Sequence, residues 1–427
     1  MNSSRQILEY EKKIAGKRRT IIASSLDGVE QIVVIPALAE KDFLFAVLAC
    51  LSRNCRKELE RTLVLCVVNN RGSHSASASD IENNLETIRY LRPLIEGLPY
   101  KFVAGAEIYS YVEEIASSPL RLACIDASSP GSEMPDKSGG VGAARKIGMD
   151  AALTVFDYGT AADKLLFCLD ADTLVEGNYL QAVRSFFDAG ENAAAVVNYS
   201  HKRPATAGGR LAIGAYEIFL RYYVLGLYYA GSPYAFHTIG STIVCTADAY
   251  AAVGGMNRKD AAEDFYFLNK LAKYTKIGRI TTTSVYPSAR VSRRTPFGTG
   301  RRMIGFMEGG KNAFLLYDPR VFLILKNWLD IIKSSPHRRI EEILAHAGKI
   351  NPLLLSFLEE ADFPGVWERI GKNIKSSEGL LRHFHFWFDA LKTMKLIHFL
   401  TERGIPQTDM FSALEQLLIR MRTMNLR

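Results

Sequence analysis

Apolar runs that read as buried strands alternate with helical segments up to about residue 300, and this order constrains the fold most. QIVVIPALAE at 31–40 reads as a short buried strand that Pro36 stops, and KDFLFAVLACLSRN reads as the amphipathic helix that follows it. RTLVLCVVNN at 61–70 reads as the next strand. A strand, a helix and a strand in this order predict a βαβ unit and therefore a parallel sheet.

The same pattern continues along the chain and then changes. Strands are predicted at 31–40, 61–70, 120–128, 163–172 and 192–200. Helical periodicity replaces them after residue 300, at 321–333, 343–361 and 385–404. We therefore predict an α/β fold in three parts: an N-terminal helical extension at 1–30, a catalytic domain at 31–300 and a helical C-terminal region at 301–427.

Composition argues against several classes of protein. Lys and Arg exceed Asp and Glu by 53 − 45 = 8 charges in 427 residues, so we do not expect a nucleic-acid-binding protein. The six cysteines form no Cys-x-x-Cys pair, and most fall in apolar runs, which favours buried thiols over a zinc site or disulfides. No stretch reaches the roughly 18 apolar residues of a membrane span, and no signal-peptide core is present. These features predict a cytoplasmic protein.

Two carboxylates, Asp170 and Asp172, end the strand predicted at 163–172. Strand ends of this kind face the ligand crevice of an open α/β sheet, and alternate residues of a continuing strand point the same way. Two such carboxylates repel unless a cation or a proton lies between them. Oxygen ligands suit Mg²⁺ or Mn²⁺, which can bridge a diphosphate. Alternatively, Asp172 caps the helix predicted near Gly177 while Asp170 is solvated.

A second acidic pair, Glu263-Asp264, follows the Gly-Gly turn of AVGGMN. The pair falls in the first turn of a predicted helix whose apolar side carries Phe265, Leu268 and either Leu271 or Ala272. The helix dipole favours carboxylates there, so the pair is either functional or an ordinary helix start.

An arginine-rich segment at 287–303 contains Arg290, Arg293, Arg294, Arg301 and Arg302 around two glycines. Fixed positive charges suit a diphosphate leaving group or an anionic acceptor, although a solvated basic loop is the alternative. SGGVGAARKIG lacks the Gly-x-Gly-x-x-Gly spacing and follows a polar loop, so a dinucleotide-binding dehydrogenase is a poor fit.

The order of VVIPALAE, VVNN, GGVGAARKIG, LDAD and HTIGSTIVCTADAYAAVGGMNRKDAAEDFYFLNKLAK resembles the family 2 type of nucleotide-sugar glycosyltransferases. The resemblance covers roughly 31–300 and is most specific at LDAD and at VGGM with AEDFYF. It implies the GT-A (Rossmann-like) fold, with a mixed, mostly parallel sheet flanked by helices. It also implies that Asp170 and Asp172 bind a divalent metal, Mg²⁺ or Mn²⁺, and that Asp264, beside Glu263, is the general base.

The resemblance implies a donor-binding site formed by Pro36, Ala37, Glu40, Asn69, Gly142, Arg145, Asp170 and Asp172. Three positions depart from the family pattern. Ala39 stands where the family often has Asn, Asn69-Asn70 where an Asp often contacts the base, and Lys146 where Asn is usual. The identity of the base is therefore open, and Arg145 can also be read as a solvated helix residue.

A further group is implied to bind the diphosphate or the acceptor: His237, Arg293, Arg294, Arg301 and Arg302. The arginines fall where processive members have Gln-x-x-Arg-Trp, although the Gln and the Trp are missing here. His237 precedes Gly240-Ser241, which matches a Gly-Ser turn of the family, and a structural histidine is the alternative.

These assignments predict a metal-dependent, inverting glycosyltransferase (a hexosyltransferase) that moves a sugar from a nucleotide diphosphate sugar to a hydroxyl of a glycan, lipid or small molecule. One alternative is a sugar-nucleotide-forming nucleotidyltransferase, but PALAEKD lacks the Gly-rich basic loop expected after its first strand. Another is a non-catalytic nucleotide-sugar-binding protein of the same fold. Peripheral membrane contact, through aromatic and basic C-terminal helices, and homo-oligomerisation through those helices also stay open.

Overall fold

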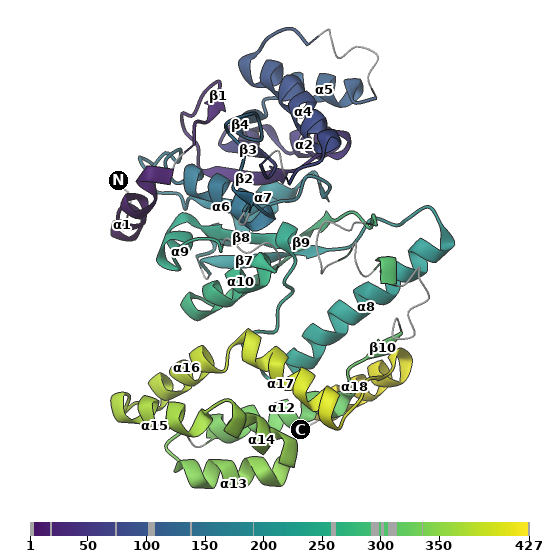
Figure 1. Cartoon of the computed structure of the whole chain (residues 1–427). Coiled ribbons are helices and arrows are strands. Elements are labelled where there is room, and N and C mark those ends of the chain that lie inside the picture. The colour runs from purple at the N-terminus through teal and green to yellow at the C-terminus, as the bar shows by residue number, and fades with distance from the viewer. Residues whose placement is uncertain are drawn as a thin grey trace. The chain divides into compact units, whose positions relative to one another are not determined.

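The computed structural model describes residues 4–17, 19–72, 75–100, 107–136, 139–190, 192–257, 262–291, 299, 303–305, 314–334 and 336–425. The chain forms two compact units (Figure 1). Unit 1 comprises Met1–Pro204 and Thr238–Arg301, and unit 2 comprises Ala205–His237 and Arg302–Arg427. Residues 205–237 therefore group with the C-terminal helices, although the sequence alone places them within 31–300.

A nine-stranded mixed sheet is the centre of unit 1, in the order β1-β4-β3-β2-β5-β8-β7-β9-β6. Its strands are β1 (Ile22–Ala23), β2 (Gln31–Ala37), β3 (Thr62–Asn69), β4 (Arg121–Ala127), β5 (Leu165–Cys168), β6 (Leu174–Val175), β7 (Ala194–Tyr199), β8 (Ile243–Thr246) and β9 (Ile277–Tyr286). β4, β3, β2 and β5 pair in parallel, and β8 pairs antiparallel with both β5 and β7. The predicted mixed sheet with parallel strands is confirmed.

Helices flank this sheet. They are α1 (Arg5–Ile14), α2 (Lys41–Ser52), α3 (Arg56–Leu59), α4 (Ala78–Glu96), α5 (Tyr109–Ala116), α6 (Val141–Ala152), α7 (Tyr179–Asp188), α9 (Ala247–Ala252) and α10 (Glu263–Tyr274). Successive residues of β5 face opposite helices: the Phe167 ring packs on Tyr179 of α7, and the Cys168 sulfur lies 3.8 Å from that of Met149 of α6. Because side chains alternate along a strand, α6 and α7 cover opposite faces.

Two features fix the position of α6 and of the N-terminal helix. A Cβ at Gly148 of α6 would lie 2.4 Å from Val34 and 2.9 Å from Val67, so only glycine lets α6 approach β2 and β3 this closely. α1, at the purple end of the chain in Figure 1, packs against α9, where Tyr10 and Tyr250 make an edge-to-face ring contact.

Strand β2 passes through Pro36, where the sequence predicts that it stops. β2 pairs with β5 only as far as Val34, whose carbonyl accepts the Leu169 N–H at 3.1 Å. Since alternate residues direct their backbone groups to the same neighbour, Pro36 also faces the β5 side, beyond the last pair. Its missing N–H therefore breaks no ladder bond, and the strand continues.

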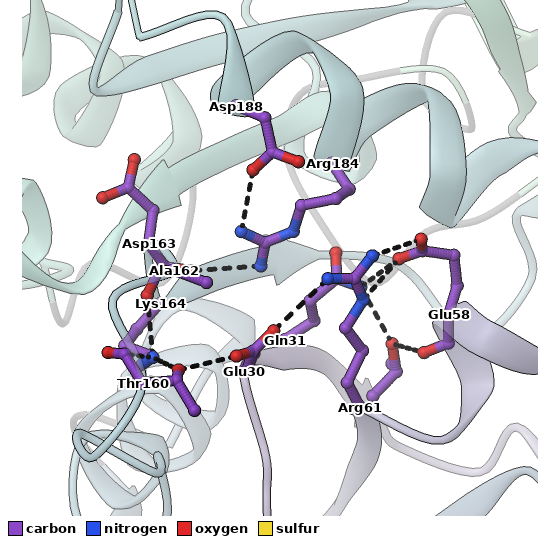
Figure 2. A network of polar contacts seen from close by, with 11 residues as sticks. Glu30, Gln31, Glu58, Arg61, Thr160, Ala162, Asp163, Lys164, Arg184 and Asp188 are labelled. Carbon is purple, nitrogen blue, oxygen red and sulfur yellow. Dashed lines mark hydrogen bonds and ion pairs between the residues drawn. The ribbon is translucent and has the colours of Figure 1, made fainter.

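A polar network ties the amino-terminal ends of β2, β3 and β5 together (Figure 2). Glu30 accepts hydrogen bonds from the Thr160 hydroxyl at 2.6 Å and from Arg61 at 3.4 Å. Arg61 also pairs with Glu58 at 2.5 Å, and the Lys164 ammonium donates to Thr160 at 2.6 Å. Glu30, Arg61 and Lys164 directly precede the three strands, so the network closes the sheet at the end away from their carboxyl termini.

Unit 2 is helical, which confirms the predicted α-helical C-terminal region. It contains α8 (Ala207–Tyr229), α12 (Pro319–Ser334), α13 (Ile340–Ile350), α14 (Pro352–Glu360), α15 (Phe363–Asn373), α16 (Ser377–Trp387), α17 (Ala390–Arg403) and α18 (Met410–Asn425), with a small sheet of β10 (Leu315–Leu316) and β11 (Thr408–Asp409). Its core centres on the buried Trp328, whose ring meets Phe363, Phe384 and Phe388 edge to face.

The segments 343–361 and 385–404 are each predicted as one helix, but in the structure a capping residue divides each of them. The Asn351 side chain accepts the Leu353 N–H at 2.8 Å and starts α14, with Pro352 in the first helical position. Asp389 caps α17 in the same way. Among the described helices, none is long and apolar enough to cross a membrane.

The cysteines are free thiols, and all except Cys55 are buried. Burial raises the pKa of the Cys66 and Cys245 thiols well above the usual range, which keeps them protonated and unreactive. The thiols are therefore core side chains, as the apolar runs around them indicate.

Candidate active site

The predicted donor-site residues gather at the carboxyl ends of parallel strands. Pro36 and Ala37 end β2, Asn69 ends β3, and Asp170 and Asp172 follow β5. The strand order reverses between β2 and β5, because β3 and β4 lie on one side of β2 and β5 on the other. Ligands of open α/β sheets bind at such a reversal. This edge of the sheet is the candidate active site.

The two aspartates do not lie on a continuing strand, contrary to the sequence argument. β5 ends at Cys168, and the Asp170 carbonyl accepts the Thr173 N–H at 3.1 Å in a turn. Asp170 and Asp172 consequently face different partners. Asp172 does not cap the following helix either, because α7 begins at Tyr179 with Asn178 before it.

Asp170 belongs to a buried cluster around Arg145 of α6. The Arg145 guanidinium pairs with Asp170 through one nitrogen and with Glu263 through another. The Ser241 hydroxyl donates to the second Asp170 oxygen. Arg145 is buried rather than solvated, and a Cβ at Gly240 would lie 2.6 Å from its Nη2. The cluster therefore joins α6, the end of β5 and the start of α10.

Asp172 faces a second arginine, Arg290, which follows β9. Arg290 Nε lies 2.9 Å from Asp172 Oδ2, and the same guanidinium pairs with Glu40. It also lies over the Phe43 ring, 4.5 Å from the centroid. Burial, reinforced by the charge of Asp170, raises the pKa of Asp172 to about 6.

The acidic pair of α10 divides into two environments. Glu263 is buried in the Arg145 ion pair, whereas Asp264 Oδ1 accepts the Phe265 N–H at 2.7 Å. Both carboxylates lie in the first turn, as predicted. Burial and the charge of Glu263 raise the pKa of Asp264, and Arg145 opposes the rise. A carboxylate of raised pKa suits a general base near neutral pH.

The residues directly before Glu40 and Glu263 have a strained backbone conformation. The described non-glycine residues with positive φ are Ala39 (50°), Ala262 (58°) and Asp362 (51°). Ala39 directly precedes Glu40, and Ala262 directly precedes Glu263. Left-handed conformations of non-glycine residues cost free energy and cluster at functional sites. At position 39 the resembling family often has Asn, a residue that tolerates this conformation.

The oxygen donors at this edge fit a hard divalent cation. Asp172 and Glu40 surround one guanidinium, whereas both Asp170 oxygens are engaged by Arg145 and Ser241. Within the described part of the chain, no three His, Cys, Asp or Glu side chains are grouped to hold a metal. One or two carboxylates completed by substrate phosphates and water are, however, a usual set for Mg²⁺.

The contacts around Arg145 and Arg290 do not include every residue that the sequence predicts for the site. Arg293, Arg294, Arg301 and Arg302 lie outside the described residues, so their roles stay predictions. His237 belongs to unit 2, and its role likewise stays a prediction. Gly142 is buried in α6, one turn before Arg145.

Sequence reasoning missed two residues of the site. Arg290 was one arginine among five in a basic segment, and its separation of 250 residues from Glu40 gave no sign of their contact. Ser241 carried a weak signal as part of the Gly240-Ser241 turn.

No protein-family model matches the sequence, and no curated protein does either. S. aureus TarS (1–349) in complex with UDP-GlcNAc is 11% identical over 88% of this chain and 93% of that chain, with a TM-score of 0.39. The mannosyltransferase PcManGT from Pyrobaculum calidifontis in complex with GDP-Man and Mn²⁺ is 14% identical over 97% and 94%, with a TM-score of 0.39. M. tuberculosis glucosyl-3-phosphoglycerate synthase is 14% identical over 72% and 86%, with a TM-score of 0.33. Scores this low establish no shared fold, so the fold class rests on the sheet itself.

Proposed function

We propose that the protein is a metal-dependent glycosyltransferase that moves a sugar from a nucleotide diphosphate sugar to an acceptor hydroxyl with inversion. The observation that carries the proposal is the Arg145 cluster. It joins a carboxylate that follows β5 at the strand-order reversal to the acidic start of α10. A donor site at the end of β5 and a base at the start of α10 would therefore meet at one edge of one sheet, which supports the function that the resemblance to GT-A glycosyltransferases implies.

Asp172 and Glu40 are the residues that would hold a divalent cation. A bound Mg²⁺ or Mn²⁺ would supply a Lewis acid that neutralises the departing diphosphate. Asp170 is held on both oxygens, so we assign it to positioning the turn that carries Asp172. Pro36, Ala37 and Asn69 line the neighbouring strand ends, where the nucleotide would lie.

Asp264 takes the proton of the acceptor hydroxyl. We assign the proton to Oδ2, because Oδ1 accepts the Phe265 N–H. The raised pKa brings the carboxylate closer to the working pH, which improves proton transfer. Glu263 pairs with Arg145 and fixes the first turn of α10.

Replacing Asp264 by Asn tests this function. The exchange keeps the shape of the side chain and removes the basic oxygen, so donor binding should survive while turnover falls about 10²–10⁴-fold. The donor is first found by thermal shift with a panel of nucleotide sugars plus Mn²⁺, because a ligand that binds the native state stabilises it. Turnover is then measured as hydrolysis of that donor, with water as the acceptor.

Asp248→Asn is the matched control, since Asp248 also lies in the first turn of a helix, α9, and outside the Arg145 cluster. It should leave turnover unchanged. Near-normal turnover by Asp264→Asn would move the base elsewhere, and loss of donor binding would place Asp264 in the donor site instead.

A further inference from the structure

Arg290 stands where a cation bound by Asp172 and Glu40 would stand. Its Nε lies 2.9 Å from Asp172 Oδ2, and its Nη2 pairs with Glu40. The guanidinium is also held from one side by the Phe43 ring, at 4.5 Å from the centroid. Salt bridges and a stacked ring together fix the charge between two carboxylates.

The charges of the site explain why a cation is needed there. Arg145 is committed to Asp170 and Glu263, with which it forms buried ion pairs. Asp172 and Glu40 side chains are only 18% and 9% exposed, so their mutual repulsion is weakly screened. Arg290 is positively charged at every accessible pH and relieves that repulsion. This is the electrostatic role that a divalent ion would have at the same carboxylates.

We infer that Arg290 is an internal competitor of the divalent cation, so that the guanidinium and the metal occupy Asp172 and Glu40 in turn. The inference rests on the proposed function, because it takes the metal at Asp172 from there. Two cations cannot share these oxygens at such short range without strong repulsion. Metal binding must therefore release Arg290, whose charge then becomes available to an anion such as the donor diphosphate.

A consequence is that the metal alone binds weakly and binds better with a nucleoside diphosphate. Without the nucleotide, the released guanidinium loses two carboxylates and gains only water. With it, the phosphates replace them as charged hydrogen-bond acceptors. Coupling of this kind is reciprocal, so the nucleotide raises Mn²⁺ affinity by the factor by which Mn²⁺ raises nucleotide affinity.

The test is a titration of the full-length protein with Mn²⁺ and no nucleotide, in which electron paramagnetic resonance reports free Mn²⁺. Arg290→Gln removes the competing charge and should tighten Mn²⁺ binding by about tenfold or more. Arg290→Lys keeps the charge and should bind Mn²⁺ nearly as wild type does. Arg279→Gln, at an exposed position of β9, makes the same change of net charge and should have no effect.

Asp172→Asn separates this inference from the proposed function. It should abolish Mn²⁺ binding in the wild-type and Arg290→Gln backgrounds alike. If Mn²⁺ binding needs Asp172 but Arg290→Gln binds no more tightly than wild type, the competition is refuted while the metal site stands. If no variant binds Mn²⁺, even with UDP or GDP present, the metal of the proposed function fails and the competition fails with it.

Discussion

Arg145 is the residue on which the geometry of the site depends most. Its planar guanidinium reaches Asp170 and Glu263 at once, whereas a single ammonium lacks that fork. Gly240 matters for the same reason, because any Cβ there would strike the guanidinium. Neither residue needs to touch the substrate to affect turnover, so both are positioning residues.

Arg145→Lys and Gly240→Ala should both lower turnover, by up to about 10²-fold, because small displacements of reacting groups are costly. KM for the donor should also rise, because Arg145 holds Asp170, which positions the turn that carries Asp172. Steady-state kinetics on donor hydrolysis measures both parameters. Gly177→Ala is the control, because a Cβ there meets only the Arg53 carbonyl at 3.7 Å. Equal losses in kcat for Gly177→Ala would show that the effect is general destabilisation.

Local patterns predicted several of the residues that the structure brings together at this edge of the sheet. AEDF placed Glu263 and Asp264 in the first turn of a helix, where the structure has them, whereas Asp170 and Asp172 of LDAD lie in the turn after β5 and not at the end of the strand. The partners of these residues could not be read from the sequence, because they depend on which strand ends meet in space. Arg145 was read as a donor contact or a solvated residue, yet it is buried between carboxylates from β5 and α10.

At the level of elements, strand and helix periods predicted the order of β2, α2 and β3 and the helical character of unit 2. The predictions differ from the structure at the end of one strand and on the buried face of one helix. α10 buries Phe267, Leu268 and Leu271, and the predicted Phe265 is only half-buried. β5 ends before Asp170 because the chain turns there. The apolar run continues through Leu169, so the hydrophobic pattern alone does not predict this turn.

The network in Figure 2 gives the sheet a pH-dependent support. Burial, the largest effect, raises the pKa of Glu30, but hydrogen bonds from Thr160 and Arg61 and the charge of Lys164 together lower it below its ordinary 4.5. A lowered folded-state pKa means that the unfolded chain binds more protons in this range. The stabilisation is therefore present above pH 4.5 and is lost as pH falls through the folded-state pKa.

Glu30→Gln should accordingly lower the free energy of unfolding by about 1 kcal/mol at neutral pH, and the difference from wild type should shrink below pH 4.5. Urea unfolding at several pH values, followed by a signal from unit 1, measures this free energy. Glu60→Gln, which breaks an exposed pair with Arg56, should have little effect at any pH. A Glu30→Gln deficit that persists unchanged into acid would show that lost packing, and not charge, causes it.

For the whole molecule, the sequence predicted an α/β part followed by helices but gave no sign that residues 205–237 group with the C-terminal region. The helical periodicity predicts that α8 has an apolar face, but it does not predict the core against which that face packs. In the structure, Tyr222 packs on Phe322 of α12, and the Tyr222 hydroxyl donates to the Tyr317 carbonyl at 2.6 Å. Such contacts, about 95 residues apart, are set by tertiary packing.

The proposed site transfers a sugar from a nucleotide diphosphate sugar. The most direct measurement is product analysis after incubating the protein and Mn²⁺ with a panel of nucleotide sugars, and in parallel with nucleoside triphosphates plus sugar phosphates. A glycosyltransferase should release a nucleoside diphosphate from one donor class, in a metal-dependent reaction that is lost in Asp172→Asn and Asp264→Asn. Pyrophosphate release from triphosphates, with every nucleotide sugar left intact, would contradict it.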